Sequence, residues 1–94
     1  MTEKQLENNF VALCRGMGVY QRKFSSPSHR GVPDRMVLHG GRAYFVEFKS
    51  PGEVPTKLQQ HEMDLLRRAG CPCYWTDNMA EAEVILDRIV SVKP

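Results

Sequence analysis

Residues 42–49, with the sequence RAYFVEFK, place an acid and a base two positions apart at the end of a strand-like segment. Aromatic and β-branched residues favour a β-strand here, and a strand sends alternate side chains to opposite faces. One face is therefore expected to carry positions 43, 45, 47 and 49, and the other to carry Tyr44, Val46 and Phe48. The pattern predicts that Glu47 and Lys49 project side by side.

A second carboxylate is expected beside this pair. Asp34 begins a predicted strand over residues 34–39, and the short segment HGG joins that strand to residues 42–49 as a hairpin. Neighbouring strands would bring Asp34 close to Glu47. Carboxylates held together repel one another, and a shared proton or a bound cation usually explains such a pair. Mg²⁺ suits the pair because it binds hard oxygen ligands and keeps several waters.

Lys49 adds a possible role in hydrolysis. A lysine on this face can orient an attacking water or help to remove its proton, and it can offset charge on a phosphate. The alternative is that Glu47 and Lys49 form a surface ion pair, which contributes under about 1 kcal/mol to stability. The spacing of these two residues does not decide between the alternatives.

The N-terminal half of the chain is the basic half. Residues 1–50 contain eight Lys and Arg against four acids, whereas residues 51–94 contain five against seven. The stretch from Tyr20 to Arg42 holds five of these basic residues and a single acid, Asp34. Such a stretch can follow the phosphates of a nucleic acid, although a solvated surface is the alternative reading of any basic run.

Hydrophobic periodicity predicts the elements that position these residues. A first helix is expected over residues 3–17 with Thr2 as its cap, because Leu6, Phe10, Leu13, Cys14 and Met17 form one apolar stripe. Strands are expected at residues 19–24, 34–39, 42–49 and 73–76, with polar loops at 25–33 and 50–56.

Two more helices complete the pattern. One is expected from about residue 56 to Gly70, with Leu58, Leu65, Leu66 and Ala69 as its buried side. The other spans residues 79–90, where Ala82, Ile85, Leu86 and Ile89 recur at helical spacing. The order αβββαβα predicts an α/β fold with a mixed central sheet flanked by helices, because the third strand, helix and fourth strand form a crossover that favours parallel pairing.

Composition indicates one small globular domain over residues 1–94, with 41% hydrophobic and 26% charged residues. The sequence holds no apolar run of the roughly 18–20 residues that a membrane span needs, and the polar start MTEKQLENN does not resemble a signal peptide. We therefore expect a cytoplasmic protein. Its three cysteines are interpreted as small apolar residues in a reducing compartment rather than as a zinc site.

The motif GVPD followed by VEFK resembles the Pro-Asp, then Asp/Glu-x-Lys signature of metal-dependent nucleases with the restriction-endonuclease-like, or PD-(D/E)xK, fold. The longer segments KFSSPSHRGVPDRMVL, YFVEFKSPGE and TKLQQHEMDLLRRAGC resemble the VRR-NUC family of viral replication and repair nucleases, in its stand-alone phage form. This resemblance extends over nearly the whole chain. It implies a deoxyribonuclease that depends on Mg²⁺ or Mn²⁺.

The resemblance also implies roles for individual residues. Asp34, Glu47 and the backbone carbonyl of Phe48 would bind the metal, and Lys49 would position the water. Gln59 matches the family glutamine on the following helix. The family has a further glutamate on its first helix, where this chain offers Glu3 and Glu7, which are one turn apart. The sequence QLE matches the family pattern and favours Glu7.

The expected partner is DNA, with Lys23, Ser28, Arg30 and Arg35 as candidate contacts around the active-site mouth. Branched DNA, such as four-way junctions or flaps, is the expected substrate, because the segment around the site resembles that of junction-resolving nucleases. A symmetric homodimer would match such a substrate and enlarge the DNA footprint. Tyr74, Trp75 and Met79 are candidates for its interface, although burial within one chain is the commoner role of such residues.

Two other functions fit the same sequence. The chain would then be a non-catalytic DNA-binding module that keeps the nuclease fold, or an interaction protein of a phage or mobile element whose acidic C-terminal half binds a partner. A titration with Mg²⁺ or Mn²⁺ separates them, because only the nuclease is expected to bind the metal.

Overall fold

The computed structural model describes residues 1–91, and its elements follow the predicted αβββαβα order. The helices are α1 (Glu3–Gly16), α2 (Lys57–Arg68) and α3 (Met79–Ser91), and the strands are β1 (Tyr20–Lys23), β2 (Arg35–His39), β3 (Arg42–Phe48) and β4 (Cys73–Thr76). Asp34 and Lys49 were predicted inside strands. They lie instead directly before β2 and directly after β3, although each still makes one backbone hydrogen bond to a neighbouring segment.

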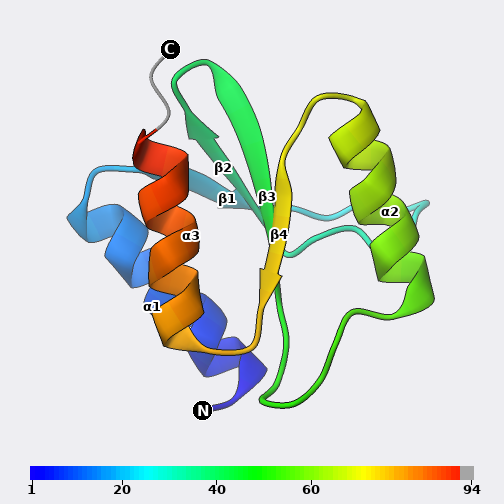
Figure 1. Cartoon of the computed structure of the whole chain (residues 1–94), viewed down its shortest axis with the longest axis horizontal. Coiled ribbons are helices and arrows are strands. Elements are labelled where there is room, and N and C mark those ends of the chain that lie inside the picture. The colour runs from blue at the N-terminus through cyan, green and yellow to red at the C-terminus, as the bar shows by residue number, and fades with distance from the viewer. Residues whose placement is uncertain (92–94) are drawn as a thin grey trace.

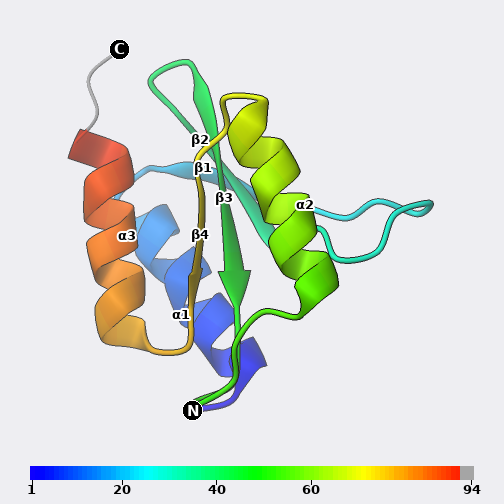
Figure 2. The same ribbon diagram turned by 45° about the vertical axis from the view of Figure 1, so that its right-hand side comes forward.

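The four strands form one mixed sheet in the order β1-β2-β3-β4. β1, β2 and β3 pair antiparallel, and the crossover through α2 places β4 parallel to β3, as predicted. Helices α1 and α3 cover one face of the sheet, and α2 covers the other (Figures 1 and 2). In the β2–β3 register Arg35 lies opposite Val46, so the preceding Asp34 lies beside Glu47 at the end of the hairpin.

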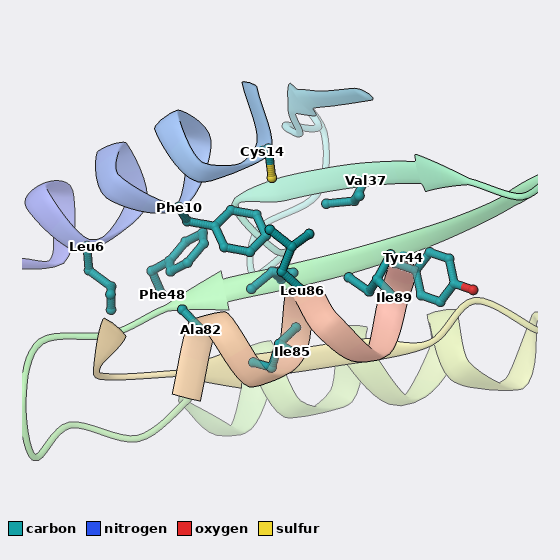
Figure 3. Close-up of a cluster of buried hydrophobic side chains, with 11 residues drawn as sticks. Leu6, Phe10, Cys14, Val37, Tyr44, Phe48, Ala82, Ile85, Leu86 and Ile89 are labelled. Atoms are coloured by element: carbon teal, nitrogen blue, oxygen red, sulfur yellow. The ribbon is translucent and has the colours of Figure 1, made fainter. Parts of the chain in front are cut away.

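The two faces of β3 carry different side chains, which confirms the predicted alternation. Tyr44, Val46 and Phe48 lie in the main hydrophobic core with residues of α1 and α3 (Figure 3), where the rings of Phe10 and Phe48 lie 5.2 Å apart. Phe45 lies on the opposite face in a smaller cluster with Met63 of α2. The next positions on that second face are 47 and 49, so both side chains emerge on the side that α2 covers.

Helix α1 begins at a capping box in which the Thr2 hydroxyl accepts a hydrogen bond from the Gln5 backbone N–H and the Gln5 side chain accepts one from Thr2. The helix buries Leu6, Phe10, Val11 and Cys14, and all of these except Val11 lie in the main core with residues of the sheet and α3. The predicted stripe was wrong at Met17, which is exposed and follows the last helical residue. The apolar spacing thus extended one residue beyond the last helical residue, Gly16.

The predicted buried side of α2 was largely wrong. Met63 is its buried residue and Leu66 is half-buried, whereas Leu58, Leu65 and Ala69 are exposed. The reason lies in the layering, because α2 is the single helix on its face of the sheet and contacts β4 along a narrow stripe. Leucines on its flanks have no second helix to cover them.

None of the helices within residues 1–91 combines the length and the apolar character that a membrane crossing requires.

Candidate active site

The loop before β2 fixes the position of Asp34 against α2. Gly31 has φ +84°, and a Cβ at this position would lie 2.9 Å from Leu58 Cγ and 3.2 Å from the Leu58 backbone. Pro33 is fully buried. The glycine of the GVPD motif therefore permits close contact with α2, and the buried proline anchors the chain directly before Asp34.

Asp34 joins the ends of β2 and β3. Its Oδ2 accepts a hydrogen bond of 2.9 Å from the Phe48 N–H. Within a strand the N–H and C=O of one residue point to the same neighbouring strand, and Lys49 N–H pairs on the opposite side, with Thr76 of β4. The Phe48 carbonyl is thus directed toward the side on which Asp34 lies, just before the first residue of β2.

Glu47 is the most unusual carboxyl group of the described residues. The residue is 3% exposed, its Oε2 accepts a hydrogen bond of 2.9 Å from Gln59 Nε2, and Lys49 Nζ lies 3.4 Å from the same oxygen. Its Oε1 is buried and has no hydrogen-bond partner among the described residues. A buried polar atom without a partner costs free energy, and a water, a shared proton or a bound ion would remove that cost.

The pKa of Glu47 is raised to about 8. Burial is the largest cause, followed by the charge and the hydrogen bond of the neighbouring Asp34, while Lys49 lowers the pKa. A positive ion placed against Oε1 would favour the ionised carboxylate and supply the missing partner. The residues present therefore fit a hard divalent cation at this position.

Gln59 reaches Glu47 because of its place in the first turn of α2. Thr56 caps this helix, and its hydroxyl accepts from the Gln59 N–H at 3.2 Å while the Gln59 Oε1 accepts from the Thr56 N–H at 2.9 Å. The oxygen of the amide thus serves the helix cap and its nitrogen serves Glu47. This double contact fixes Oε2 and leaves Oε1 as the open oxygen.

Glu7 lies on the other side of Asp34 and is fully ion-paired. Its Oε2 lies 2.7 Å from Arg35 Nε and 3.0 Å from Lys23 Nζ. Lys23 Nζ also lies 3.7 Å from Asp34 Oδ1. The ion pairs therefore join Glu7 to Asp34 through Lys23.

These side chains face a cavity of about 510 Å³ at the N-terminal end of α1. Its lining residues are Glu3, Lys4, Glu7, Asn8, Lys23, Asp34 and Arg35. Glu3 therefore lies at the same cavity as Glu7, but Glu7 forms ion pairs with Lys23 and Arg35 and Glu3 forms none among the described residues.

The four predicted DNA contacts occupy different environments. Ser28 and Arg30 are exposed in the loop between β1 and β2, and the Lys23 side chain is 54% exposed. The Arg35 side chain is 18% exposed, because its guanidinium also donates a hydrogen bond of 3.0 Å to Gln21 Oε1. Gln21 is a buried polar residue that sequence reasoning missed. Its one available signal was its place two residues before Lys23, on the same strand face.

The described residues contain no group of three or more His, Cys, Asp or Glu side chains arranged around a common point. A cation here would therefore rest on two carboxylates, Asp34 and Glu47, the Phe48 carbonyl and water. Mg²⁺ accepts such a set, because it commonly binds through one or two carboxylates and retains several waters.

Solved structures share this fold. One described as "VRR_NUC domain" matches with a TM-score of 0.82 and 23% sequence identity, over 93% of this chain and 97% of that chain. Another, described as "VRR_NUC domain protein", matches with a TM-score of 0.83 and 13% identity, over 97% of this chain and 89% of that chain. The predicted fold and the resemblance to the VRR-NUC family are thereby confirmed.

A sequence relative points the same way. The protein named "Putative nuclease p44" of Acyrthosiphon pisum secondary endosymbiont phage 1 is 48% identical to this chain over 61 residues. The aligned segment covers 64% of this chain and 66% of the relative, which is just under two thirds of its length. No family model matches the chain.

Proposed function

From this VRR-NUC fold, we propose that the chain is a nuclease that uses Mg²⁺ or Mn²⁺ to hydrolyse phosphodiester bonds in DNA. The observation that carries the proposal is the buried Glu47 Oε1, to which no donor of the described residues is directed, so that in the ionised form only a cation placed between Glu47 and Asp34 would satisfy it. A purely structural glutamate at this depth would be expected to have both oxygens satisfied. Glu47 instead keeps one oxygen open for a cation.

The active-site residues divide the work of hydrolysis. Asp34, Glu47 and the Phe48 carbonyl would hold the cation, which when bound offsets the negative charge that develops on the phosphate. Lys49 lies 3.4 Å from Glu47 on the same face, so its ammonium holds the attacking water beside the scissile phosphate. Gln59 keeps Glu47 in its orientation through Oε2.

Glu7, rather than Glu3, is the helix glutamate of this proposal. It contacts Lys23 and Arg35 directly and lies at the same cavity as Asp34. Lys23, Ser28 and Arg30 are the proposed phosphate contacts, because their side chains are accessible near the cavity or in the adjoining loop. Arg35 is assigned to hold Glu7, since its guanidinium is already shared between Glu7 and Gln21.

The proposed substrate is branched DNA, including four-way junctions and flaps. This small domain, 32 × 31 × 21 Å across, offers a small footprint, so a substrate that presents two duplex arms would suit a pair of such domains related by a two-fold axis. The reducing cytoplasm is the proposed location. The three cysteines of the chain are free, which agrees with a reducing compartment.

A symmetric homodimer finds support at the open edge of β4. This strand ends the sheet, and beside it lies a cavity of about 340 Å³ lined by residues of β4, α2 and α3. Tyr74 and Trp75, predicted as interface residues, both line this cavity while each also packs against a hydrophobic cluster, whereas Met79 packs against the main core and does not line the cavity. Antiparallel pairing of two β4 edges would complete the hydrogen bonds of both strands.

The exposed face of α3 is complementary to itself. Val84 is half-exposed at the cavity, with Glu81 three residues before it and Arg88 four residues after it, about 4.5 and 6 Å along the helix axis. A two-fold axis at Val84 would therefore place each Glu81 against the Arg88 of the other copy. This arrangement supports a dimer in which α3 packs antiparallel to its counterpart.

Charge reversal tests the dimer. Glu81→Arg alone and Arg88→Glu alone should each give a monomeric mass by light scattering at micromolar concentration, because each places like charges together. The double variant should restore the dimer, since the exchanged charges again face opposite partners. A wild-type monomer with full activity would remove the dimer from the proposal.

A cleavage panel tests the function as a whole. Labelled linear, flap, splayed and four-way DNA substrates are incubated with the chain and Mg²⁺, Mn²⁺ or a chelator. We expect cleavage that requires the metal and that prefers the branched substrates when unlabelled linear DNA competes at moderate salt, because salt weakens non-specific phosphate binding. DNA binding without cleavage under all conditions would instead support a non-catalytic DNA-binding module.

A further inference from the structure

Lys23 lies between two carboxylates at the cavity beside the proposed metal site. Its Nζ is 3.0 Å from Glu7 Oε2 and 3.3 Å from Glu7 Oε1, and it is 3.7 Å from Asp34 Oδ1. Asp34 is also a proposed ligand of the cation. One ammonium therefore offsets the charge of the helix glutamate and of a metal-binding aspartate at the same time.

The two cations around Glu7 differ in how firmly they are held. Arg35 is largely buried and is anchored by the hydrogen bond from its Nη1 to Gln21 Oε1, and Gln21 is itself buried. The Lys23 side chain is 54% exposed, and its ion pairs with Glu7 and Asp34 are the contacts that hold its ammonium. Lysine also has a long flexible stem. The Arg35 guanidinium is therefore expected to remain paired with Glu7, whereas the Lys23 ammonium can move away from the two carboxylates.

We propose that Lys23 is a replaceable internal counter-ion. It neutralises Asp34 and Glu7 until a divalent cation binds, and its ammonium then forms an ion pair with a DNA phosphate instead. The inference rests on the metal site of the proposed function. A divalent cation at Asp34 would repel the ammonium and would balance the charge of Asp34 in its place, while Arg35 stays paired with Glu7. The displaced ammonium stays at the mouth of the same cavity, where a phosphate would approach.

This exchange couples the two ligands of the protein. Metal binding frees Lys23 for DNA, and a phosphate that draws Lys23 away from Asp34 leaves that carboxylate more available to the metal. Thermodynamic linkage requires each ligand to strengthen binding of the other by the same factor. Lys23 therefore opposes metal binding in the free protein, and DNA relieves that opposition.

The test compares Lys23→Gln with Lys4→Gln in calorimetric titrations with Mn²⁺ and no DNA. Lys4 is an exposed lysine that lines the same cavity and makes no ion pair among the described residues, so its variant removes an equal charge without removing the contact. We expect Lys23→Gln to bind Mn²⁺ roughly two- to fivefold more tightly than wild type, the size of one partly exposed ion pair. Lys4→Gln should show a clearly smaller gain, and Lys23→Arg should show a smaller gain than Lys23→Gln because it keeps the positive charge.

The second arm measures coupling with DNA. In a Lys49→Ala background, chosen so that bound DNA stays intact, Mn²⁺ should strengthen DNA binding, and adding Lys23→Gln should reduce that enhancement. Equal gains in Mn²⁺ affinity for Lys23→Gln and Lys4→Gln, or weaker Mn²⁺ binding by Lys23→Gln, would overturn the inference alone. Absence of Mn²⁺ binding by the wild-type chain would overturn both the inference and the proposed nuclease.

Discussion

Glu47 and Glu7 flank the same aspartate, but their surroundings are opposite. Glu47, on β3, is buried with one oxygen held by Gln59 and Lys49 and the other without a partner among the described residues. Glu7, on α1, faces a cavity and is ion-paired with Arg35 and Lys23. The charge of Glu7 is balanced by the protein itself, whereas the Oε1 of Glu47 is where the proposed cation would bind.

This difference shows how a small site can hold several acids without a metal present. Burial keeps Glu47 protonated near neutral pH, since its pKa is raised to about 8, and the two basic side chains neutralise Glu7. The repulsion that three ionised carboxylates would cause is thereby reduced. We infer that metal binding must remove a proton at Glu47.

The largest effects on Mn²⁺ affinity and cleavage are expected from changes at Glu47 and its neighbours Asp34 and Lys49. Glu47→Ala and Asp34→Ala should lower both Mn²⁺ affinity and cleavage, whereas Lys49→Ala should retain metal binding and lose turnover on the order of 10²- to 10³-fold. Calorimetry and a quantitative cleavage assay measure the two effects separately. Circular dichroism provides the control that each variant is folded, and undiminished cleavage by any of them would exclude that residue from the site.

The pH dependence of Mn²⁺ affinity provides a second test of the difference between Glu47 and Glu7. Because Glu47 has a pKa of about 8 and must be ionised to bind a cation, affinity should rise by at most about tenfold per pH unit up to pH 8 and then level off. Calorimetric titrations between pH 6 and 9 in buffers of different protonation enthalpy report the released proton. An affinity that is constant over this range would contradict the assignment of that proton.

The metal-free protein should show the matching effect on stability. An acid whose pKa is about 8 when folded and 4.5 when unfolded binds more protons in the folded state. The free energy of unfolding should therefore fall as pH rises from 4.5 to about 8. The stabilisation from the proton on Glu47 is fully present only below pH 4.5, the pKa of the unfolded state. Glu47→Gln should remove that part of the pH dependence in denaturant titrations, which makes it the matched control.

A smaller effect is expected on the α1 side. Glu7→Gln should impair cleavage more than Glu3→Gln, because Glu7 contacts Lys23 and Arg35 while Glu3 only lines the cavity. Matched assays at saturating Mn²⁺ should show a loss of roughly tenfold for Glu7→Gln, in the range for residues that orient metal ligands. The reverse ranking would identify Glu3 as the functional glutamate of this helix.

Much of the site follows from patterns that span only a few residues. The alternation of a strand puts Glu47 and Lys49 on one face, and the short hairpin brings Asp34 beside them. The residues Thr56 and Gln59 form a capping box from their spacing alone. Such features are encoded locally because backbone geometry fixes the directions of near neighbours.

Only the tertiary structure decided which charges meet and how deeply they are buried. The ion pairs from Glu7 to Lys23 and Arg35 join positions 16 and 28 residues apart, and they distinguish Glu7 from Glu3, which shares its helix. The open oxygen of Glu47 and the exposed leucines of α2 likewise depend on how helices cover the sheet. Periodicity gives the direction of a side chain, but the burial and partners of that side chain depend on segments that approach from elsewhere in the chain, because solvent exclusion is a property of the packed layers.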